Sequence, residues 1–387
     1  MATNTIAVIA PFHGVGEKVL VGVADYFQKQ TRLKMRPIHL DANVSFENMD
    51  LSRMGGAIIV DMLEEMPQAL RDLNIPKVEV FERNHKEGVP LVSVDNDQIG
   101  ALAAQHLYGR GFKHFAFVGG IDHPFSKNRY MAFKKFLDGK NVNLHLFSET
   151  FPPRSLGSTQ DPRWKGFFDR LMTWLDALPK PVGVFASDDW KAFDTQLACR
   201  SLGIEIPGQV AVIGVNDDNL ACQIAETPQS SIRLPYERVG FEAAAMLDAI
   251  LSDKPTDKRR ILKPIGLVTR ESTNTFAVTD EIVEKALRFM QKESNKPIRV
   301  EEVLKHVGVS RSLLERRFRG AIGRTPLVEM RRQRVERARA LLADTDLAIN
   351  QIASMCGFAS NIRFTTVFRE QVGVTPTDFR AQMHSMS

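Results

Sequence analysis

Short apolar stretches alternate with amphipathic stretches along the first 275 residues of the chain. The apolar stretches have the length and the β-branched or aromatic content of buried strands: Ile6–Ala10, Ala57–Val60, Val78–Phe81, Leu91–Val94, Phe115–Val118, Val182–Ala186 and Val210–Val215. The stretches between them have helical spacing: Val19–Gln30, Gln98–Tyr108, Asp169–Ala177, Lys191–Leu202 and Arg238–Leu251. Strands separated by helix-length segments predict βαβ units and mostly parallel sheets. Because so many elements exceed what one doubly wound sheet usually holds, we expect two α/β lobes that share a cleft.

The last quarter of the chain has a different pattern, which occurs twice. The sequence F-R-x-x-x-G-x-T-P begins at Phe318 and begins again at Phe368, 50 positions later. Upstream, the pattern V-x-x-V-L-x-x-x-G of residues 300–308 is echoed by I-x-x-I-A-x-x-x-G at 349–357. An internal repeat of this length predicts that the same supersecondary unit forms twice.

Each copy of the repeat predicts two helices joined by a tight turn. In the first copy an apolar stripe over 300–307 precedes Gly308, which tolerates the left-handed conformation that ends a helix. Ser310 is a suitable N-cap for the second helix, and Leu314 and Phe318 face inward along it. This is the pattern of a helix-turn-helix, whose second helix enters the major groove of DNA. We expect the first motif, the connecting helix and the second motif at 299–321, 327–342 and 348–372.

The distribution of charge separates the same two parts of the chain. Over 387 residues, 51 Lys and Arg face 46 Asp and Glu, which gives a formal net charge of +5. Residues 281–387 hold 19 of the basic and 12 of the acidic residues, so they carry +7 and the remainder carries −2. A basic segment of this kind indicates an anionic partner, most often nucleic acid.

Polar groups follow the predicted strands of the first part. Asp61, Asp95, Asp188 and Asn216 each come directly or within two residues after an apolar stretch, with Phe12 and Trp190 as aromatic neighbours. Carboxylates and amides bind hydroxyl groups and aromatic rings cover the apolar face of a sugar, so the set predicts a small polyhydroxylated ligand. Each acidic or amide residue taken alone is also explained as the cap of the following helix.

Catalytic, metal and membrane motifs are missing from the sequence. The glycines after the first strand lack the third glycine of a dinucleotide fingerprint, because position 19 is valine, and we find no phosphate loop or nucleophile elbow. The histidines lack metal-ligand spacing, and the three cysteines are far apart. No apolar run approaches the ~18 residues that span a bilayer, and Met1 precedes a strand-like segment instead of a signal peptide. We therefore expect a cytoplasmic protein with no catalytic residues, metal, cofactor or membrane contact, although a carboxylate pair that processes sugar stays open.

Several stretches of the first part resemble the LacI/GalR effector domain, which is itself similar to periplasmic sugar-binding proteins. They are VSVDNDQIGALAAQHLYGRGFKHFAFVGG (93–120), SKNRYMAF, ASDDWKA (186–192) and VAVIGVNDDNLA (210–221). The resemblance implies a two-lobed domain over 1–275, with lobe 1 at 1–110 and 236–262 and lobe 2 at 111–235 and 263–275. It also implies that Arg129, Asp188 and Asn216 contact the sugar. The family usually has asparagine in place of Asp188 and aspartate in place of Asn216, so these positions do not identify the sugar.

The duplicated part, residues 280–387, resembles the AraC/XylS DNA-binding domain, above all in IASMCGFASNIRFTTVFREQVGVTPTDFR. Arg311 lies on the outer face of the first reading helix. The resemblance implies base contacts from Ser312, Glu315 and Arg316 in the first motif and from Asn361, Arg363, Thr365 and Thr366 in the second. Thr366 stands where many members have arginine.

The order of the two resemblances, sensor first and DNA reader second, is uncommon and resembles pentose-responsive transcription activators. It implies D-xylose as effector, a double-stranded operator or promoter, contact with RNA polymerase and a homodimer. We expect the sugar to close the cleft and to bias the placement of two readers. The segment Thr273–Asp280 is short enough to transmit that motion, with Thr279 or Asp280 as cap of the first reader helix. A different small polar metabolite, or retained sugar-processing activity, stays open as an alternative.

Overall fold

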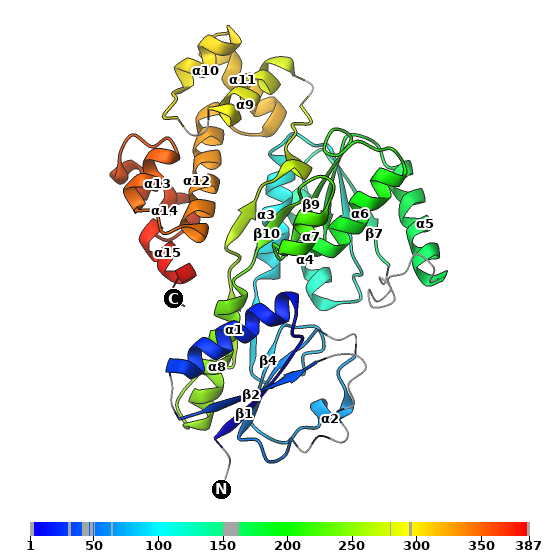
Figure 1. The fold of residues 1–387 in the computed structure, drawn as a ribbon. Coiled ribbons are helices and arrows are strands. Elements are labelled where there is room, and N and C mark those ends of the chain that lie inside the picture. The colour runs from blue at the N-terminus through cyan, green and yellow to red at the C-terminus, as the bar shows by residue number, and fades with distance from the viewer. Residues whose placement is uncertain are drawn as a thin grey trace.

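The computed structural model describes residues 4–384 except 30–31, 41–45, 47–48, 50, 63–64, 150–161, 279 and 294–295. Residues 4–278, the α/β region, form two lobes, and residues 280–384, the helical region, lie against the second lobe (Figure 1). Within the described residues, no helix is both long enough and apolar enough to cross a membrane.

Lobe 1 is built on a six-stranded parallel sheet in the order β11-β5-β4-β3-β1-β2. Its strands are β1 (Thr5–Ala10), β2 (Lys34–His39), β3 (Gly56–Val60), β4 (Lys77–Val80), β5 (Leu91–Val94) and β11 (Arg259–Leu262). Its helices are α1 (Gly14–Lys29), α2 (Gln68–Arg71) and α8 (Tyr236–Leu251). Helices α1 and α8 pack so closely that a Cβ atom added at Gly22 would lie 1.8 Å from the Glu237 carbonyl oxygen, so only glycine fits there.

Lobe 2 holds the second six-stranded sheet, in the order β12-β10-β9-β8-β6-β7, in which only β12 is antiparallel to its neighbour. Its strands are β6 (His114–Val118), β7 (Asn143–Phe147), β8 (Val182–Ala186), β9 (Val210–Val215), β10 (Ser230–Arg233) and β12 (Gly266–Val268). Its helices are α3 (Asn96–Tyr108), α4 (Pro124–Leu137), α5 (Pro162–Ala177), α6 (Asp189–Ser201) and α7 (Asn219–Ile224), and a 3-10 turn, η2 (Glu271–Thr273), packs on β9.

The predicted two-lobed α/β fold is confirmed, and the seven apolar stretches form the central strands of the two sheets. The strands that the sequence did not predict lie mostly at or near the sheet edges. Three of them, β2, β7 and β11, carry exposed or half-buried positions and therefore lack a continuous apolar run.

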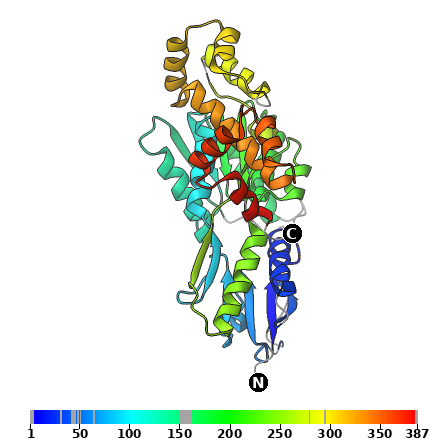
Figure 2. The ribbon, with the colours of Figure 1, turned by 90° about the vertical axis from the view of Figure 1, so that its left-hand side faces the viewer.

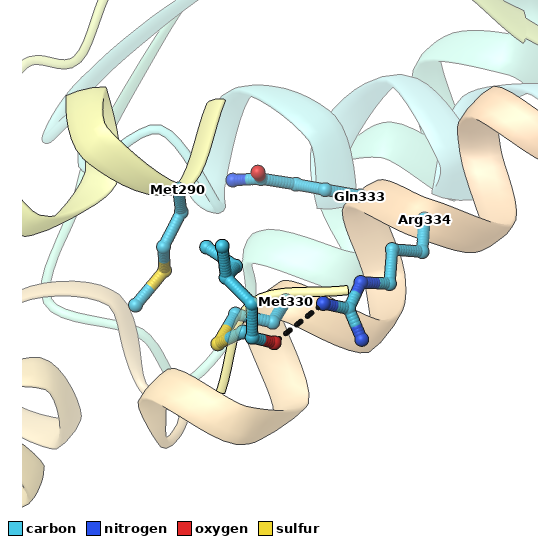
Figure 3. A pocket seen from close by; sticks show the side chains of 5 residues that line it. Met290, Met330, Gln333 and Arg334 are labelled. Atoms are coloured by element: carbon cyan, nitrogen blue, oxygen red, sulfur yellow. Dashed lines mark hydrogen bonds between the residues drawn. The ribbon is translucent and has the colours of Figure 1, made fainter. Parts of the chain in front are cut away.

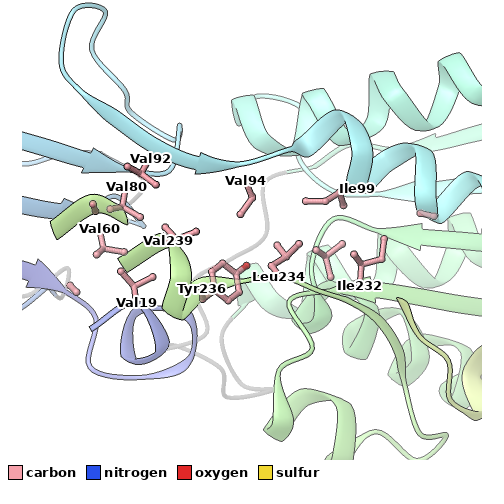
Figure 4. Packing of buried hydrophobic residues seen from close by; sticks show 14 of the residues in the cluster. Val19, Val60, Val80, Val92, Val94, Ile99, Ile232, Leu234, Tyr236 and Val239 are labelled. Carbon is pink, nitrogen blue, oxygen red and sulfur yellow. The ribbon is translucent and has the colours of Figure 1, made fainter. Parts of the chain in front are cut away.

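The chain passes between the lobes three times, after β5, after β10 and after β11. The first passage lies at residue 95, earlier than the predicted position near 110, because α3 packs on α4 and β8 of lobe 2. The amphipathic pattern of a helix predicts that the helix packs on a sheet, but it does not show which sheet. One apolar core continues through the passages by way of Val94, Ile232, Leu234 and Tyr236 (Figure 4).

The helical region consists of two helix-turn-helix units joined by one long helix. Its helices are α9 (Glu281–Lys292), α10 (Val300–Val307), α11 (Arg311–Ile322), α12 (Pro326–Asp344), α13 (Ile349–Met355), α14 (Asn361–Val372) and α15 (Pro376–His384). Each unit has its own core, one around Phe318 and one around Phe368. Gly308 adopts a left-handed conformation with φ of 71° at the end of α10, as the sequence predicted. The side chain of Asp280 accepts hydrogen bonds from the backbone of Ile282 and Val283 and caps α9, whereas Thr279 lies outside the described residues.

The helical region is tied to lobe 2 through the segment before α9 and through α12. The backbone N–H of Ala277 donates to the carbonyl oxygen of Arg110 at 2.8 Å, and α12 packs on β12. Arg324, just before α12, donates from Nη2 to the carbonyl oxygen of Gly109 at 2.9 Å. Figure 1 shows α12 running along the flank of lobe 2, while α9, α10 and α11 lie at the end of lobe 2 that is farther from lobe 1, as Figure 2 also shows.

Candidate effector and DNA-reading sites

Residues in an uncommon backbone conformation follow two strands where the lobes meet. Phe81 after β4 has φ of 73°, and Asn216 after β9 has φ of 113°. Positive φ in a residue with a side chain costs about 1–3 kcal/mol and persists where the surroundings hold it. Tyr236, at the passage between the lobes, provides that hold: its hydroxyl donates to Asn216 Oδ1 at 2.5 Å, and its ring meets the Phe81 ring edge-on at 5.7 Å.

Arg129 of α4 is buried at the same junction, with 4% of its surface exposed. Its Nε donates to Asn96 Oδ1 at 2.9 Å, and its Nη1 donates to the carbonyl oxygen of Ser187 at the end of β8. Burial lowers the pKa of Arg129, while Tyr236 and the carboxylate of Asp188 oppose this effect. The guanidinium is therefore a fixed donor between the first turn of α3 and the end of β8.

Asp95 and Asp188 cap the helices that follow them, which is the simpler of the two roles considered for them. Asp95 accepts from the backbone of Gln98 at 2.8 Å and begins α3. Asp188 accepts from the backbone of Lys191 at 3.0 Å and from its ammonium group, and begins α6. Burial acts against ionisation of Asp188, but Lys191 outweighs it and lowers the pKa of the carboxyl. The carboxylate of Asp188 thus remains charged close to Arg129.

The other predicted effector residues, Asp61, Phe12 and Trp190, each contact a further side chain. Asp61 is 2% exposed and accepts from the side chain of Asn84 at 2.8 Å, and burial raises the pKa of its carboxyl. Phe12 is 47% exposed and packs on His39 with a centroid distance of 4.9 Å. Trp190, on the first turn of α6, is half-buried and meets Phe193 at 6.0 Å.

Three junction residues escaped the sequence analysis: Phe81, Asn96 and Tyr236. A fourth, Asp217, directly follows Asn216 among the polar groups at the strand ends. Asp217 binds Arg233 and Arg270 through its carboxylate, and its carbonyl oxygen accepts from Lys18 of lobe 1 at 3.4 Å. Burial opposes ionisation of Asp217, but the two arginines lower its pKa. The contacts of Phe81 and Tyr236 join residues that lie far apart along the chain, so no local sequence pattern reveals them.

The first reading helix, α11, presents charged groups on its outer face. Arg311, Ser312 and Arg316 are exposed, and Glu315 is half-buried. The Glu315 carboxylate accepts from Arg311 at 3.2 Å and from Arg319 at 3.4 Å. The predicted base-reading residues of this motif therefore share one face.

The second reading helix, α14, carries its predicted residues on the corresponding face. Asn361, Arg363 and Thr366 are exposed and Thr365 is half-buried, whereas Phe364 points into the core. The hydroxyl of Thr366 donates to the carbonyl oxygen of Ile362 at 2.9 Å, so it is already bonded within the helix. Ser360 caps the helix by accepting from the backbone of Arg363 at 3.2 Å.

Arg334 of α12 lies between the two helix-turn-helix units. A small hollow between α9 and α12 is lined by Met290, Ile298, Met330, Gln333 and Arg334 (Figure 3). At its edge Arg334 donates to the carbonyl oxygen of Ile298 at 2.7 Å and lies 6.0 Å from the ring of Phe358 in the second unit. Arg334 thus contacts residues of both units. Among the described residues no group of three His, Cys, Asp or Glu side chains is placed to hold a metal ion.

Comparison with protein families divides the chain at the same place. Residues 104–273 match the periplasmic binding protein-like domain, and residues 303–382 match a helix-turn-helix domain. A LacI family regulator from Enterococcus faecium with bound ribose covers 70% of this chain and 98% of its own, with a TM-score of 0.55 and 23% identity, which supports the fold of the α/β region.

Similarity over nearly the whole chain comes from xylose regulators. The xylose operon regulatory protein of Escherichia coli (strain K12) is 30% identical over 338 residues, 84% of either chain. That of Haemophilus influenzae is 28% identical over 295 residues, 75% of this chain and 74% of its own. The solved structure of the xylose-binding transcription activator XylR covers 97% of both chains with a TM-score of 0.59 and 26% identity. These relatives are regulators of a xylose operon or activators of transcription. The chain therefore belongs to the family of xylose operon regulatory proteins and is a DNA-binding transcription regulator with a periplasmic-binding-protein-like sensor.

Proposed function

We propose that the protein is a D-xylose-dependent transcription activator whose sugar binds where the two lobes meet. The observation that carries this proposal is the buried Arg129 beside Asn216 and Tyr236, at the strand ends where ligands of parallel sheets bind. A guanidinium has five N–H donors, so an arginine held by Asn96 and Ser187 can also donate to sugar hydroxyls. The relatives named for xylose support the choice of sugar.

In this proposal polar and aromatic groups have different roles in sugar binding. Arg129, Asp188 and Asn216 bind hydroxyl groups of the sugar. Phe12 and Trp190 cover its apolar face, and Asp61 and Asp95 hold the strand ends in place through their hydrogen bonds to Asn84 and Gln98.

The DNA is bound by α11 and α14, each in a major groove. Helix α12 between the two units spans 19 residues, roughly 28 Å at 1.5 Å per residue, close to the ~34 Å between successive grooves on one face of DNA. The base contacts come from Arg311, Ser312, Glu315 and Arg316 on α11 and from Asn361, Arg363, Thr365 and Thr366 on α14. The protein works as a cytoplasmic homodimer that binds promoter DNA and engages RNA polymerase.

A thermal-shift panel of aldoses tests the sensor. D-Xylose at 100 times its dissociation constant should stabilise the protein by about 2.7 kcal/mol, and D-ribose, L-arabinose and D-glucose should each do less at the same concentration. Arg129→Met should lose the response while operator affinity without sugar stays the same. Arg200→Met, which removes an exposed arginine paired with Glu226, is the matched control and should respond like the wild type. A panel in which no aldose raises the melting temperature contradicts the proposal.

A further inference from the structure

We infer that α14 selects its DNA site through the methyl groups of thymine, with Ile362 as the side chain that contacts them. The inference rests on the proposed function, because it requires α14 to lie in a major groove. Ile362 is the second residue of α14 and is 81% exposed. Among the described large apolar side chains the next most exposed is Leu220, at 58%.

Thr366 extends the apolar surface of Ile362 by one helical turn. Residues four apart on a helix are neighbours on its surface. Because the Thr366 hydroxyl donates its proton to the carbonyl oxygen of Ile362, this exposed side chain presents its methyl group and an oxygen that can only accept a hydrogen bond. Ile362 and Thr366 thus form an apolar ridge on the face that the helix-turn-helix turns toward DNA, and we call it the methyl ridge.

The first reading helix has the opposite chemistry at the two matched positions. The 50-residue offset of the repeat places Ser312 at the position of Ile362 and Arg316 at the position of Thr366. Arginine in a major groove binds the O6 and N7 acceptors of guanine, whereas the thymine methyl is the one apolar group on the base edges. The two helices are therefore built to read different base pairs, guanine under α11 and thymine under α14.

The surroundings of the methyl ridge favour DNA as its occupant over another protein. A single exposed apolar residue is common on any surface and needs no partner. Here it is flanked by exposed Asn361, Arg363 and Arg369, an amide and two guanidinium groups that suit base edges and phosphates. A protein-binding patch is depleted of charge at its centre, and this face is not.

The first step of the test is to select binding sites from random double-stranded DNA with the full-length protein, with and without D-xylose. We expect a bipartite site in which guanine is enriched in one half and thymine in the other. Selection of no sequence would contradict the proposed function itself and with it this inference. Selection of a site without a required A·T pair in either half contradicts the inference alone.

The second step replaces each selected thymine, one at a time, by 2′-deoxyuridine, which lacks only the methyl group. At one or two positions the wild-type protein should bind roughly fourfold more weakly, as expected for one lost buried methyl group. Ile362→Ala should bind the thymine site more weakly and should show no further loss with deoxyuridine. This variant should fold, because position 362 is exposed and alanine favours helices.

Two further variants separate a methyl contact from a general effect on DNA binding. Ile362→Val keeps a branched apolar side chain and should retain most of the difference between thymine and deoxyuridine. Leu220→Ala removes an exposed apolar side chain from α7 of the sensor and should retain the full difference. The inference is overturned if deoxyuridine is neutral at every position in the wild type, or if Ile362→Ala keeps the fourfold loss.

Discussion

At the scale of single residues, Asp189 is a carboxyl group whose ionisation the fold alters strongly. It follows the cap residue of α6 and is fully buried. It accepts from the backbone of Asp218 at 2.8 Å and from the side chain of Gln229 at 3.1 Å. Burial raises the pKa of Asp189 to about 8, with the nearby carboxylates of Asp188 and Asp217 adding to the rise. Near neutral pH the folded protein therefore holds a proton here.

Because the folded protein holds this proton, we expect its free energy of unfolding to fall as the pH rises. In the unfolded chain the carboxyl ionises near pH 4, so between pH 4 and 8 the folded state binds one proton more than the unfolded state. The contribution of Asp189 to the free energy of unfolding is complete below pH 4. It is lost as the pH rises toward 8, with a slope of about 1.4 kcal/mol per pH unit. Asp189→Asn resembles the protonated form and should flatten the dependence. Urea unfolding between pH 5 and 8 measures it.

The control for this prediction is Asp176→Asn, which changes an exposed aspartate of α5. It should follow the wild-type dependence. If the free energy of unfolding has the same slope against pH in the wild type and in Asp189→Asn, Asp189 is already ionised in the folded protein.

The sequence located the lobe junction better than it assigned roles within it. The strand-end rule pointed to Asp188 and Asn216, and the family resemblance added Arg129 of α4, which lies close to Asp188 and Tyr236. The same residue types also cap helices, so the sequence could not tell that Asp95 and Asp188 are engaged in that way. Tyr236 was missed because its two partners lie far away along the chain, 20 residues or more.

At the scale of elements, α12 carries an ion cluster buried against lobe 2. Glu329 is fully buried and accepts from Arg324, from Arg332 at 2.9 Å and from Gln333 at 2.7 Å. Burial opposes its ionisation, but the two arginines outweigh burial and hold the pKa of Glu329 at about 2. The carboxylate is therefore charged at every pH at which the protein is handled.

Removal of this carboxylate should destabilise the protein strongly. Glu329→Ala leaves the largely covered side chains of Arg324 and Arg332, which are 15% and 18% exposed, without their counter-ion, which typically costs about 3–5 kcal/mol. Glu284→Ala removes a carboxylate from an exposed pair with Arg288 on α9 and should cost less than about 1 kcal/mol. Chemical unfolding of both variants compares the two costs. Similar values for the two substitutions would mean that the Glu329 cluster adds nothing beyond a surface ion pair.

The elements themselves were largely predictable, and their partners were not. The repeat gave both helix-turn-helix units, and the predicted linker of 327–342 lies within α12, Pro326–Asp344. Part of the basic face of α12, however, surrounds the buried Glu329 instead of facing solvent. Periodicity shows which face of a helix is apolar, but a polar face can be buried once each charge meets an opposite one.

At the scale of the whole molecule, α3 connects the proposed sugar site to the helical region. Asn96 on its first turn holds Arg129. At its other end, roughly 20 Å away along the helix, Gly109 accepts from Arg324 and Arg110 accepts from Ala277. His106 and Arg110 lie buried in this second contact, where burial, with the neighbouring arginines, lowers the pKa of both groups. A shift of α3 when sugar binds would reach α12 through these contacts.

The last prediction concerns the coupling between sugar and DNA. If sugar changes operator affinity by some factor, operator DNA must change sugar affinity by the same factor, and factors of about 5–150 are typical. Arg324→Met removes the hydrogen bond to Gly109 but leaves Arg332 and Gln333 on Glu329, so both binding sites should stay intact. We expect both coupling factors to fall together, by roughly 2- to 30-fold, as for other mutations between two coupled sites. Titration of sugar with and without operator, and of operator with and without sugar, gives the two factors.

Arg200→Met, on the surface of lobe 2, is the control and should leave both coupling factors at the wild-type value. If Arg324→Met keeps the wild-type coupling, the signal does not pass through the contact between α3 and Arg324, and the segment from Ser272 to Val278, which runs beside β9 and Arg110, becomes the route to test next.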